Sequence, residues 1–350
     1  MSRSGWKMAL QIAATYIGTV VGAGFASGQE VLQFFTGLGP GAIFAIFLAT
    51  VLFFALGLFA MRLGRERALP TFGAAASALL GQRGGRAANI LLLLLLFGVT
   101  VAMVAGSGAL AAEVFRAPFA AGALLAALLA AATVLLGLRA IMVVNSIIVP
   151  CMLAFVTLTF AYSTASGLIR PALSAPLPAP MWWPPVRAAV TYAGFNVGLS
   201  LTVLVPLGHV PANRRTLAAG ALLGACGLGV LLLLLHILLA SSYGALRGWE
   251  VPLLFYARSL PLPLRAGFVL VLWAEIYSTL IANVYGLAEE LSSLTGWPRG
   301  TLAVCLLTAA YAACQVGFAR IVAVAYPIFG YAGLLILAAL IVRSRRPLRL

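Results

Sequence analysis

The chain alternates between long apolar stretches and short polar breaks over its whole length. Because the stretches are continuously apolar, they predict membrane-spanning helices and not the alternating strands of an outer-membrane barrel. A helix needs about 20 apolar residues to cross a bilayer. Ten stretches approach or exceed that length, near residues 7–36, 40–62, 87–115, 118–138, 140–168, 187–208, 216–243, 264–292, 298–316 and 320–342. The pattern predicts an all-α membrane protein with ten transmembrane helices.

Composition supports this and narrows the chemistry. Hydrophobic residues make up 63% of the 350 residues and charged residues 8%, against about 25% charged residues in soluble proteins. The seven acidic residues are all Glu, and there are two His. Without Asp and with scattered His, nucleophile–base pairs and metal clusters are hard to assemble, so we expect no enzyme. Four cysteines in apolar segments indicate packing thiols. The positive charge is no signature of a nucleic-acid partner, because it lies between the apolar runs.

The basic residues lie mostly at the ends of apolar segments, where they act as orientation signals. With the N-terminus inside and ten crossings, fifteen of the 22 Lys and Arg residues fall on the cytoplasmic side and seven outside. This predicts that both termini are cytoplasmic. Two longer connections then lie outside: a Pro- and Trp-rich loop at 169–185 and an amphipathic segment at 245–263.

The chain also contains an internal repeat. Residues 15–22 and 191–198 both read T-Y-x-G-x-x-V-G, in the first and sixth segments. We therefore expect a duplicated five-helix unit, 1–168 and 187–350, joined by an external linker at 169–186 within a single membrane domain. Because five is odd, the second copy must cross the membrane upside-down, which makes an inverted repeat.

The repeated motif predicts where the helices are broken. Residues 22–28 read GAGFASG in mid-span, and each Gly costs a helix about 1 kcal/mol relative to Ala. A break frees N–H and carbonyl groups that lipid cannot satisfy, so they must face protein or a wet cavity. Broken first and sixth helices in equivalent positions point to a central substrate site. The alternative is a close helix-packing face of small residues.

These residues also carry a family resemblance. The string IGTVVGAGF at 17–25 resembles the first-helix signature of amino acid–polyamine–organocation permeases and, more loosely, of LeuT-type sodium symporters. The longer string YIGTVVGAGFASGQEVLQFF at 16–35 is similar to the YkvI-type bacterial membrane proteins, regarded as distant amino-acid permeases. The resemblance covers essentially the whole chain. It implies a LeuT-like fold in the bacterial cytoplasmic membrane.

The resemblance also implies a substrate site. In similar transporters the amides of the broken first helix hold the substrate carboxylate, and the sixth-helix break contacts its ammonium and side chain. A third-helix lining is matched by Ser107, for which close packing is the alternative. The substrate contacts implied in the two breaks are Gly22, Ala23, Gly24, Phe25, Phe195, Asn196, Val197 and Gly198.

A sodium site is implied in the same way. In sodium-coupled relatives the ion is bound by two first-helix carbonyls, an eighth-helix carbonyl and two eighth-helix hydroxyls. Apart from this ion, no cofactor is expected. Proton-coupled relatives often place a fifth-helix Lys there, whereas this chain has only Lys7, which favours sodium. Glu275, a carboxyl group in mid-membrane, is also a proton-relay candidate; the alternative is a neutral structural Glu. The matching sodium ligands are Gly18, Val21, Glu275, Ser278 and Thr279.

Two further polar residues follow the first break. Gln29 and Glu30 either gate the outer vestibule or cap the half-helix, where negative charge is favoured. Taken together, the sequence predicts a secondary transporter of an amino acid or similar small zwitterion or amine, coupled to sodium or protons. The alternative is a non-transporting receptor of the same fold that binds a small metabolite. The sequence does not predict the substrate's identity or the oligomeric state.

Overall fold

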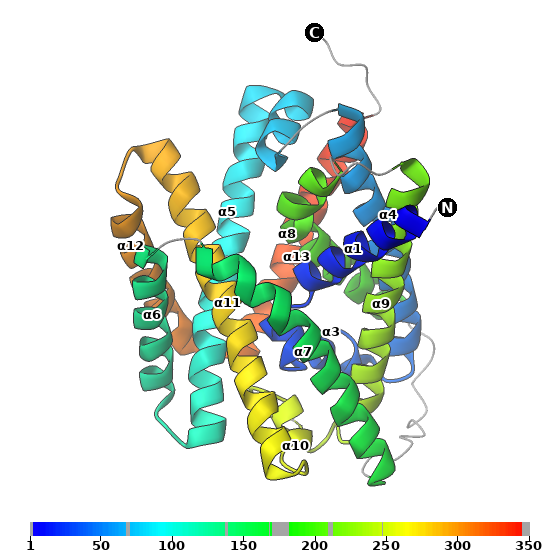
Figure 1. The fold of residues 1–350 in the computed structure, drawn as a ribbon, viewed down its shortest axis with the longest axis vertical. Coiled ribbons are helices and arrows are strands. Elements are labelled where there is room, and N and C mark those ends of the chain that lie inside the picture. The colour runs from blue at the N-terminus through cyan, green and yellow to red at the C-terminus, as the bar shows by residue number, and fades with distance from the viewer. Residues whose placement is uncertain are drawn as a thin grey trace.

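The computed structural model describes residues 3–67, 71–136, 139–167, 169, 182–208, 213–246 and 248–344. Throughout these ranges the regular structure is helical, and they contain no strand. The helices form a bundle in which α1 begins and α13 ends in the same half of the molecule (Figure 1). In chain order the elements are α1 Arg3–Val20, α2 Ala23–Ala26, α3 Gln29–Phe34, the 3-10 helix Thr36–Leu38, α4 Gly41–Arg67, α5 Phe72–Phe115, α6 Phe119–Leu136, α7 Arg139–Ala165, α8 Trp183–Leu207, α9 Arg214–Ala240, α10 Leu253–Ala257, α11 Leu262–Thr295, α12 Arg299–Ala313, the 3-10 helix Cys314–Val316 and α13 Phe318–Ser344.

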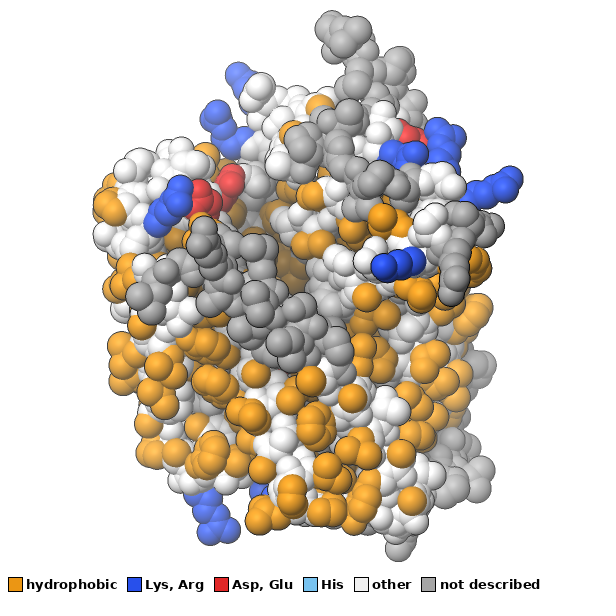
Figure 2. All heavy atoms as spheres, viewed as in Figure 1, with side chains coloured by type: hydrophobic (Ala, Val, Ile, Leu, Met, Phe, Trp, Pro, Cys, Tyr) orange, Lys and Arg blue, Asp and Glu red, His pale blue; other side chains and the backbone are white. Residues whose placement is uncertain are grey.

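The surface of the bundle fits a lipid bilayer. Among the described residues, seven helices are long and apolar enough to span a membrane, and Phe119–Leu135 and Cys151–Ala165 are shorter apolar helices. Large side chains such as Phe47 and Leu125 are exposed on the outside. In the view of Figure 2, Lys and Arg side chains gather at the two ends, and the belt between them is largely hydrophobic. The prediction of an all-α membrane protein is confirmed.

The first predicted segment is interrupted as expected. It consists of three short helices, α1, α2 and α3, and the backbone between α1 and α2 is extended at Gly22 (φ −128°, ψ −171°). A second turn at Gly28 has φ 81°, in the left-handed region that favours glycine. Two of the glycines in the predicted break are therefore used to change the chain direction.

The predicted break in the sixth segment is wrong. Helix α8 continues without interruption from Trp183 to Leu207. Its glycines serve a close contact with α13: a Cβ on Gly194 would lie 2.5 Å from the Gly330 carbonyl oxygen, and one on Gly198 would lie 2.8 Å from the Gly333 Cα. Small residues allow such close backbone approach between membrane helices. The packing alternative therefore describes these glycines, and α8 stays intact.

The helix contacts follow a regular pattern. The contacts come in equivalent pairs: α1–α9 with α8–α4, α5–α6 with α11–α12, and α5–α13 with α11–α7. The two contacts of a pair become identical when each of the five long helices of 1–168 is replaced by the helix at the same place in the order of 187–350. A duplicated five-helix unit produces this pattern, which supports the predicted repeat, although the duplication itself stays a prediction. Most of the predicted linker at 169–186 lies outside the described residues.

Candidate functional site

The break in the first segment leaves backbone groups unpaired. The N–H of Val21 donates to Ile17 O (2.8 Å), and the next helical bond is from Ala26 N–H to Gly22 O (2.8 Å). The N–H groups of residues 22–25 have no backbone acceptor in the described part of the chain. Free N–H groups inside a membrane bundle must face a cavity or a polar side chain.

A cavity of about 510 Å³ lies at this break. Its wall is formed by the end of α1, α2, α5, α8, α11 and Tyr326 of α13. It reaches from Gly24 and Glu30 at the break to Asn89 on α5 and Glu290 on α11. The first part of α5 and the last part of α11, which contain these two residues, lie in the half of the bundle in which α1 begins and α13 ends (Figure 1). The cavity therefore connects the centre of the bundle with that end.

Glu30 lies directly against the break. It is 4% exposed, and the Tyr192 hydroxyl donates to its Oε2 at 3.0 Å. A Cβ on Gly24 would collide with Glu30 Oε1 and lie 2.8 Å from its Cγ and Cδ. The absence of a side chain at Gly24 thus leaves room for the Glu30 carboxyl group. The sequence placed Glu30 in a gate or a cap; in the structure it is part of the cavity wall.

Aromatic rings surround this end of the cavity. The rings of Phe195 and Tyr326, both in the wall, are 4.3 Å apart between centroids. Tyr192 packs against Phe35 at 4.9 Å and against Phe34 at 5.1 Å. This packing fixes the Tyr192 hydroxyl and, through it, the position of Glu30.

Some of the predicted substrate contacts come together here. Those in the cavity wall are Gly22, Ala23, Gly24, Phe195 and Asn196. Phe25, Val197 and Gly198 are buried elsewhere in the packing. The Asn196 amide donates to its own helix, at Tyr192 O (3.0 Å).

Ser107 lines a different cavity. This second cavity, of about 1020 Å³, lies between α5, α6, α10 and α11. The Ser107 hydroxyl is buried there without a hydrogen-bond partner in the described part of the chain. The wall of the central cavity on α5 is formed by other residues, from Asn89 to Met103.

The predicted sodium ligands are distributed over neighbouring elements. Gly18, Val21 and Thr279 line the central cavity, and α2 packs against α11. No N–H of residues 22–25 reaches the carbonyls of Gly18 or Val21, which leaves two oxygens of the kind that a hard cation prefers. On α11 the Ser278 hydroxyl donates to Glu275 O at 3.1 Å. Gly18, Val21 and Thr279 are therefore placed where they could bind a sodium ion in the cavity, and the sodium site stays a prediction.

Glu275 does not face the central cavity. Its side chain is 3% exposed, and its Oε2 has no hydrogen-bond partner among the described residues. The cavity wall on α11 begins one turn further along, at Thr279. The proton-relay role of Glu275 is therefore a prediction about a buried carboxyl group beside the site.

Sequence reasoning found Thr279 but missed three further wall residues on α11. Asn283, Gly286 and Glu290 line the cavity together with Thr279, and the Asn283 Nδ2 is buried with no partner in the described chain. Their spacing of four, three and four residues places them on one helix face. This stripe of polar and small residues in an apolar segment is the signal that could have found them.

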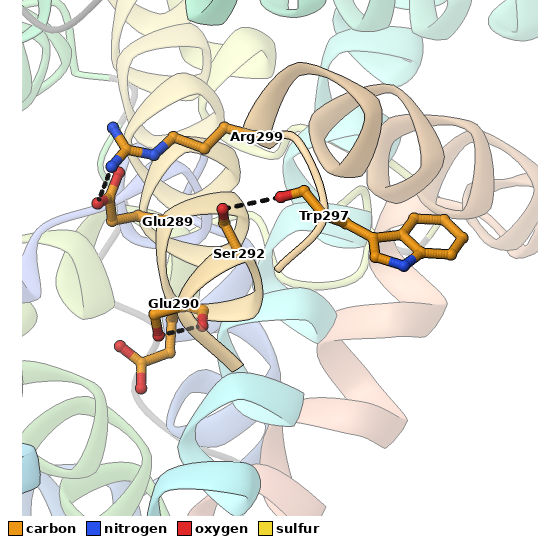
Figure 3. Close-up of polar contacts among 6 residues, drawn as sticks. Glu289, Glu290, Ser292, Trp297 and Arg299 are labelled. Carbon is orange, nitrogen blue, oxygen red and sulfur yellow. Dashed lines mark hydrogen bonds and ion pairs between the residues drawn. The ribbon is translucent and has the colours of Figure 1, made fainter. Parts of the chain in front are cut away.

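At the cavity mouth, Glu290 differs from its neighbour Glu289. Glu289 pairs with Arg299 at 2.7 Å, whereas Glu290 points away from that pair (Figure 3). The Asn89 amide donates to Glu290 Oε1 at 2.5 Å. No salt bridge to Glu290 occurs within the described ranges. A carboxylate thus faces the cavity without a cationic partner.

The opposite end of the break is covered by the segment around α10. The Leu253 N–H donates to Ser27 O at 3.0 Å. Glu113 on α5 accepts from the Glu250 N–H at 2.6 Å, and the Glu250 carboxylate accepts from the Ala319 N–H at 2.5 Å. The amphipathic segment expected at 245–263 therefore contains the short helix α10, which is largely buried. The segment is hydrogen-bonded to Ser27, to α5 and to α13.

Known structures with this arrangement are membrane transporters. MhsT in complex with L-phenylalanine matches 97% of this chain and 88% of its own with a TM-score of 0.67 and 18% identity. A sodium-coupled sialic acid symporter matches 96% and 78% (TM-score 0.62, 12% identity), and inward-facing Mhp1 matches 97% and 78% (TM-score 0.61, 13% identity). At these identities the likeness defines the fold, which is that of the LeuT-type transporters.

The family follows from closer relatives. The membrane protein YkvI of Bacillus subtilis (strain 168) is 30% identical over 346 residues, which cover 96% of each chain. The protein YyaD of the same organism is 27% identical over 339 residues, covering 96% of this chain and 97% of its own. No family model matches the sequence. The chain belongs to the YkvI family of membrane proteins.

Proposed function

We propose that this protein is a secondary active transporter of an amino acid or similar small zwitterion or amine in the bacterial cytoplasmic membrane. The observation that carries the proposal is the cavity of about 510 Å³ at the broken first helix. It combines unpaired backbone N–H groups, an aromatic pair and buried polar side chains in the middle of a membrane bundle. Such a constellation suits a small polar solute and not a lipid.

The shape of the cavity supports an alternating-access mechanism. The cavity extends to Asn89 and Glu290 at one end, and the α10 segment covers the break at the other. With both termini cytoplasmic, as the basic residues predict, this conformation faces inward. Release of the bond between Leu253 and Ser27, together with the Glu113 contacts, would open the outer side. Coupling to sodium or to protons would bias the exchange.

A thermal-shift panel on the purified protein tests the proposal. Amino acids and amines are added in sodium and in potassium buffer, because a ligand of the folded state stabilises it by about 2.7 kcal/mol at a hundred times its Kd. We expect at least one compound to raise the melting temperature. Gly24→Leu, whose side chain would collide with Glu30, should fold as a monodisperse protein and lose that response. A response that survives in Gly24→Leu would mean that the substrate site is elsewhere.

A further inference from the structure

In the described part of the chain, the ionisable groups that line the central cavity are all acidic. They are Glu30 and Glu290, and none of the described lining residues is Lys, Arg or His. Three amide side chains, Asn89, Asn196 and Asn283, complete its polar lining apart from hydroxyl groups. A buried carboxylate without a cationic partner is costly, and a bound cation removes that cost. The wall itself therefore favours a positively charged ligand.

The position of Glu30 in the first-helix break also bears on the charge of the ligand. In LeuT-like transporters the substrate carboxylate is expected at the amides of the first-helix break. Here the carboxyl group of Glu30 itself lies against Gly24 in that break, fixed by the Tyr192 hydroxyl at 3.0 Å. A substrate carboxylate would meet a second carboxylate at that point, and like charges this close disfavour each other.

The remaining neighbours suit an ammonium group. Phe195 and Tyr326, whose rings pack at an angle of 35° to each other, line the same end of the cavity. Aromatic faces attract cations, more strongly where water is excluded. At the mouth, Glu290 adds a second negative charge, which raises the local concentration of cations.

We propose that the cavity binds the ammonium group of an organic amine, with Glu30 as its counter-ion, and that the substrate needs no carboxylate. The inference rests on the proposed function only in taking this cavity as the substrate site. Within that proposal it selects amines over zwitterions and anions.

Three probes with one branched carbon skeleton separate these classes: isopentylamine, leucine and 4-methylpentanoate. Their affinities are measured by thermal shift on the purified protein. We expect isopentylamine to stabilise the wild type more than leucine does, and 4-methylpentanoate to have no effect. Equal or tighter binding of 4-methylpentanoate would overturn the inference. The same holds if no amine from methylamine to hexylamine stabilises the protein.

Variants then test the counter-ion. Glu30→Gln keeps the side-chain shape and an acceptor for Tyr192 but removes the charge, so the affinity for isopentylamine should fall at least about tenfold. Tyr192→Phe keeps the charge of Glu30 and should therefore lower the affinity for isopentylamine less than Glu30→Gln does. Glu289→Gln, which removes a carboxylate paired with Arg299 outside the cavity, is the matched control and should bind like wild type. Unchanged amine affinity in Glu30→Gln would overturn the assignment. If Glu30→Gln does not fold, the comparison of probes on the wild type decides alone.

These outcomes are separable from those of the proposed function. Amine binding that depends on Glu30, without any uptake into liposomes, would leave the inference standing and remove the transport function. Uptake of 4-methylpentanoate by the wild type would leave the transport function standing and overturn the inference.

Discussion

At the scale of single residues, two adjacent hydroxyls on α11 have different surroundings. Ser278 is buried and donates to the Glu275 carbonyl, whereas Thr279 lies in the cavity wall. The Ser278 bond uses two oxygens that were both expected to hold sodium. This bond does not block an incoming ion, because the donating Ser278 oxygen keeps its lone pairs and the Glu275 carbonyl oxygen has a second lone pair.

Removal of both hydroxyls tests the sodium site. About five oxygen ligands would fall to three in Ser278→Ala with Thr279→Ala, so the stabilisation by sodium should be lost. The expected fall in affinity is at least as large as the roughly 10–100-fold that the loss of an outer partner costs. Sodium titrations followed by thermal shift measure this. Glu275→Gln should keep the response, because its backbone carbonyl remains.

The matched control is Ser293→Ala with Thr295→Ala. These hydroxyls are exposed on the same helix and donate to its own carbonyls. Sodium should stabilise this double variant like the wild type. If instead Glu275→Gln abolishes a pH-dependent activity and the Ser278 and Thr279 hydroxyls are dispensable, the coupling ion is a proton and Glu275 carries it.

At the scale of elements, the contact of α8 with α13 is set by glycines. A Cβ on Gly333 would collide with the Gly194 carbonyl oxygen, and one on Gly330 with that of Thr191. Backbone atoms of two intact helices cannot yield as a flexible side chain can. These positions therefore fix how close α8 lies to α13, and with it the place of Phe195 in the cavity wall.

Gly333→Ala should consequently destabilise the protein, by about 1–3 kcal/mol as overpacking usually does. Gly73→Ala is the matched control, since its added Cβ would meet no atom within 4 Å. We expect a lower midpoint of thermal unfolding for Gly333→Ala and none of this decrease for Gly73→Ala. Equal midpoints for the two variants would show that α8 and α13 can separate at little cost.

The two glycine-rich motifs show how far the sequence could predict the elements. Both contain T-Y-x-G-x-x-V-G, yet the first segment breaks after Val20 and α8 does not break. The first break was predictable from the further glycines at 22–28. The intact α8 was not, because the glycines that it packs against, Gly330 and Gly333, lie far away in the sequence.

The candidate site was predictable to a similar degree. Gly22, Ala23 and Gly24 were found because a break needs glycine and leaves free amides. Glu30 was noticed, but its folding back onto Gly24 depends on Tyr192 and on the aromatic packing around it. A sequence pattern does not show that Tyr192, far away in the chain, lies next to Glu30.

At the scale of the whole molecule, the distribution of basic residues predicts its orientation. The ten predicted crossings assign fifteen of the 22 Lys and Arg residues to the side of the termini, and the charged side chains visible in Figure 2 are concentrated at that end. The α10 segment, at the opposite end in Figure 1, should then face outward.

Cysteine labelling checks this orientation. In a background without the four native cysteines, Ser259→Cys, exposed just after α10, should react with an impermeant reagent added to whole cells. Ser293→Cys, exposed near the end of α11, should react only after lysis. The reverse order of labelling would place the termini outside and would make the observed conformation outward-facing.

Transport through the central cavity is the central claim, and uptake into proteoliposomes tests it most directly. The compound that stabilises the protein most strongly is supplied outside, with an inward gradient of sodium or of protons. We predict accumulation above that in empty liposomes, dependent on one of the two gradients and absent in Gly24→Leu. Binding without uptake under either gradient, and without exchange against preloaded compound, would contradict the claim and identify the protein as a receptor.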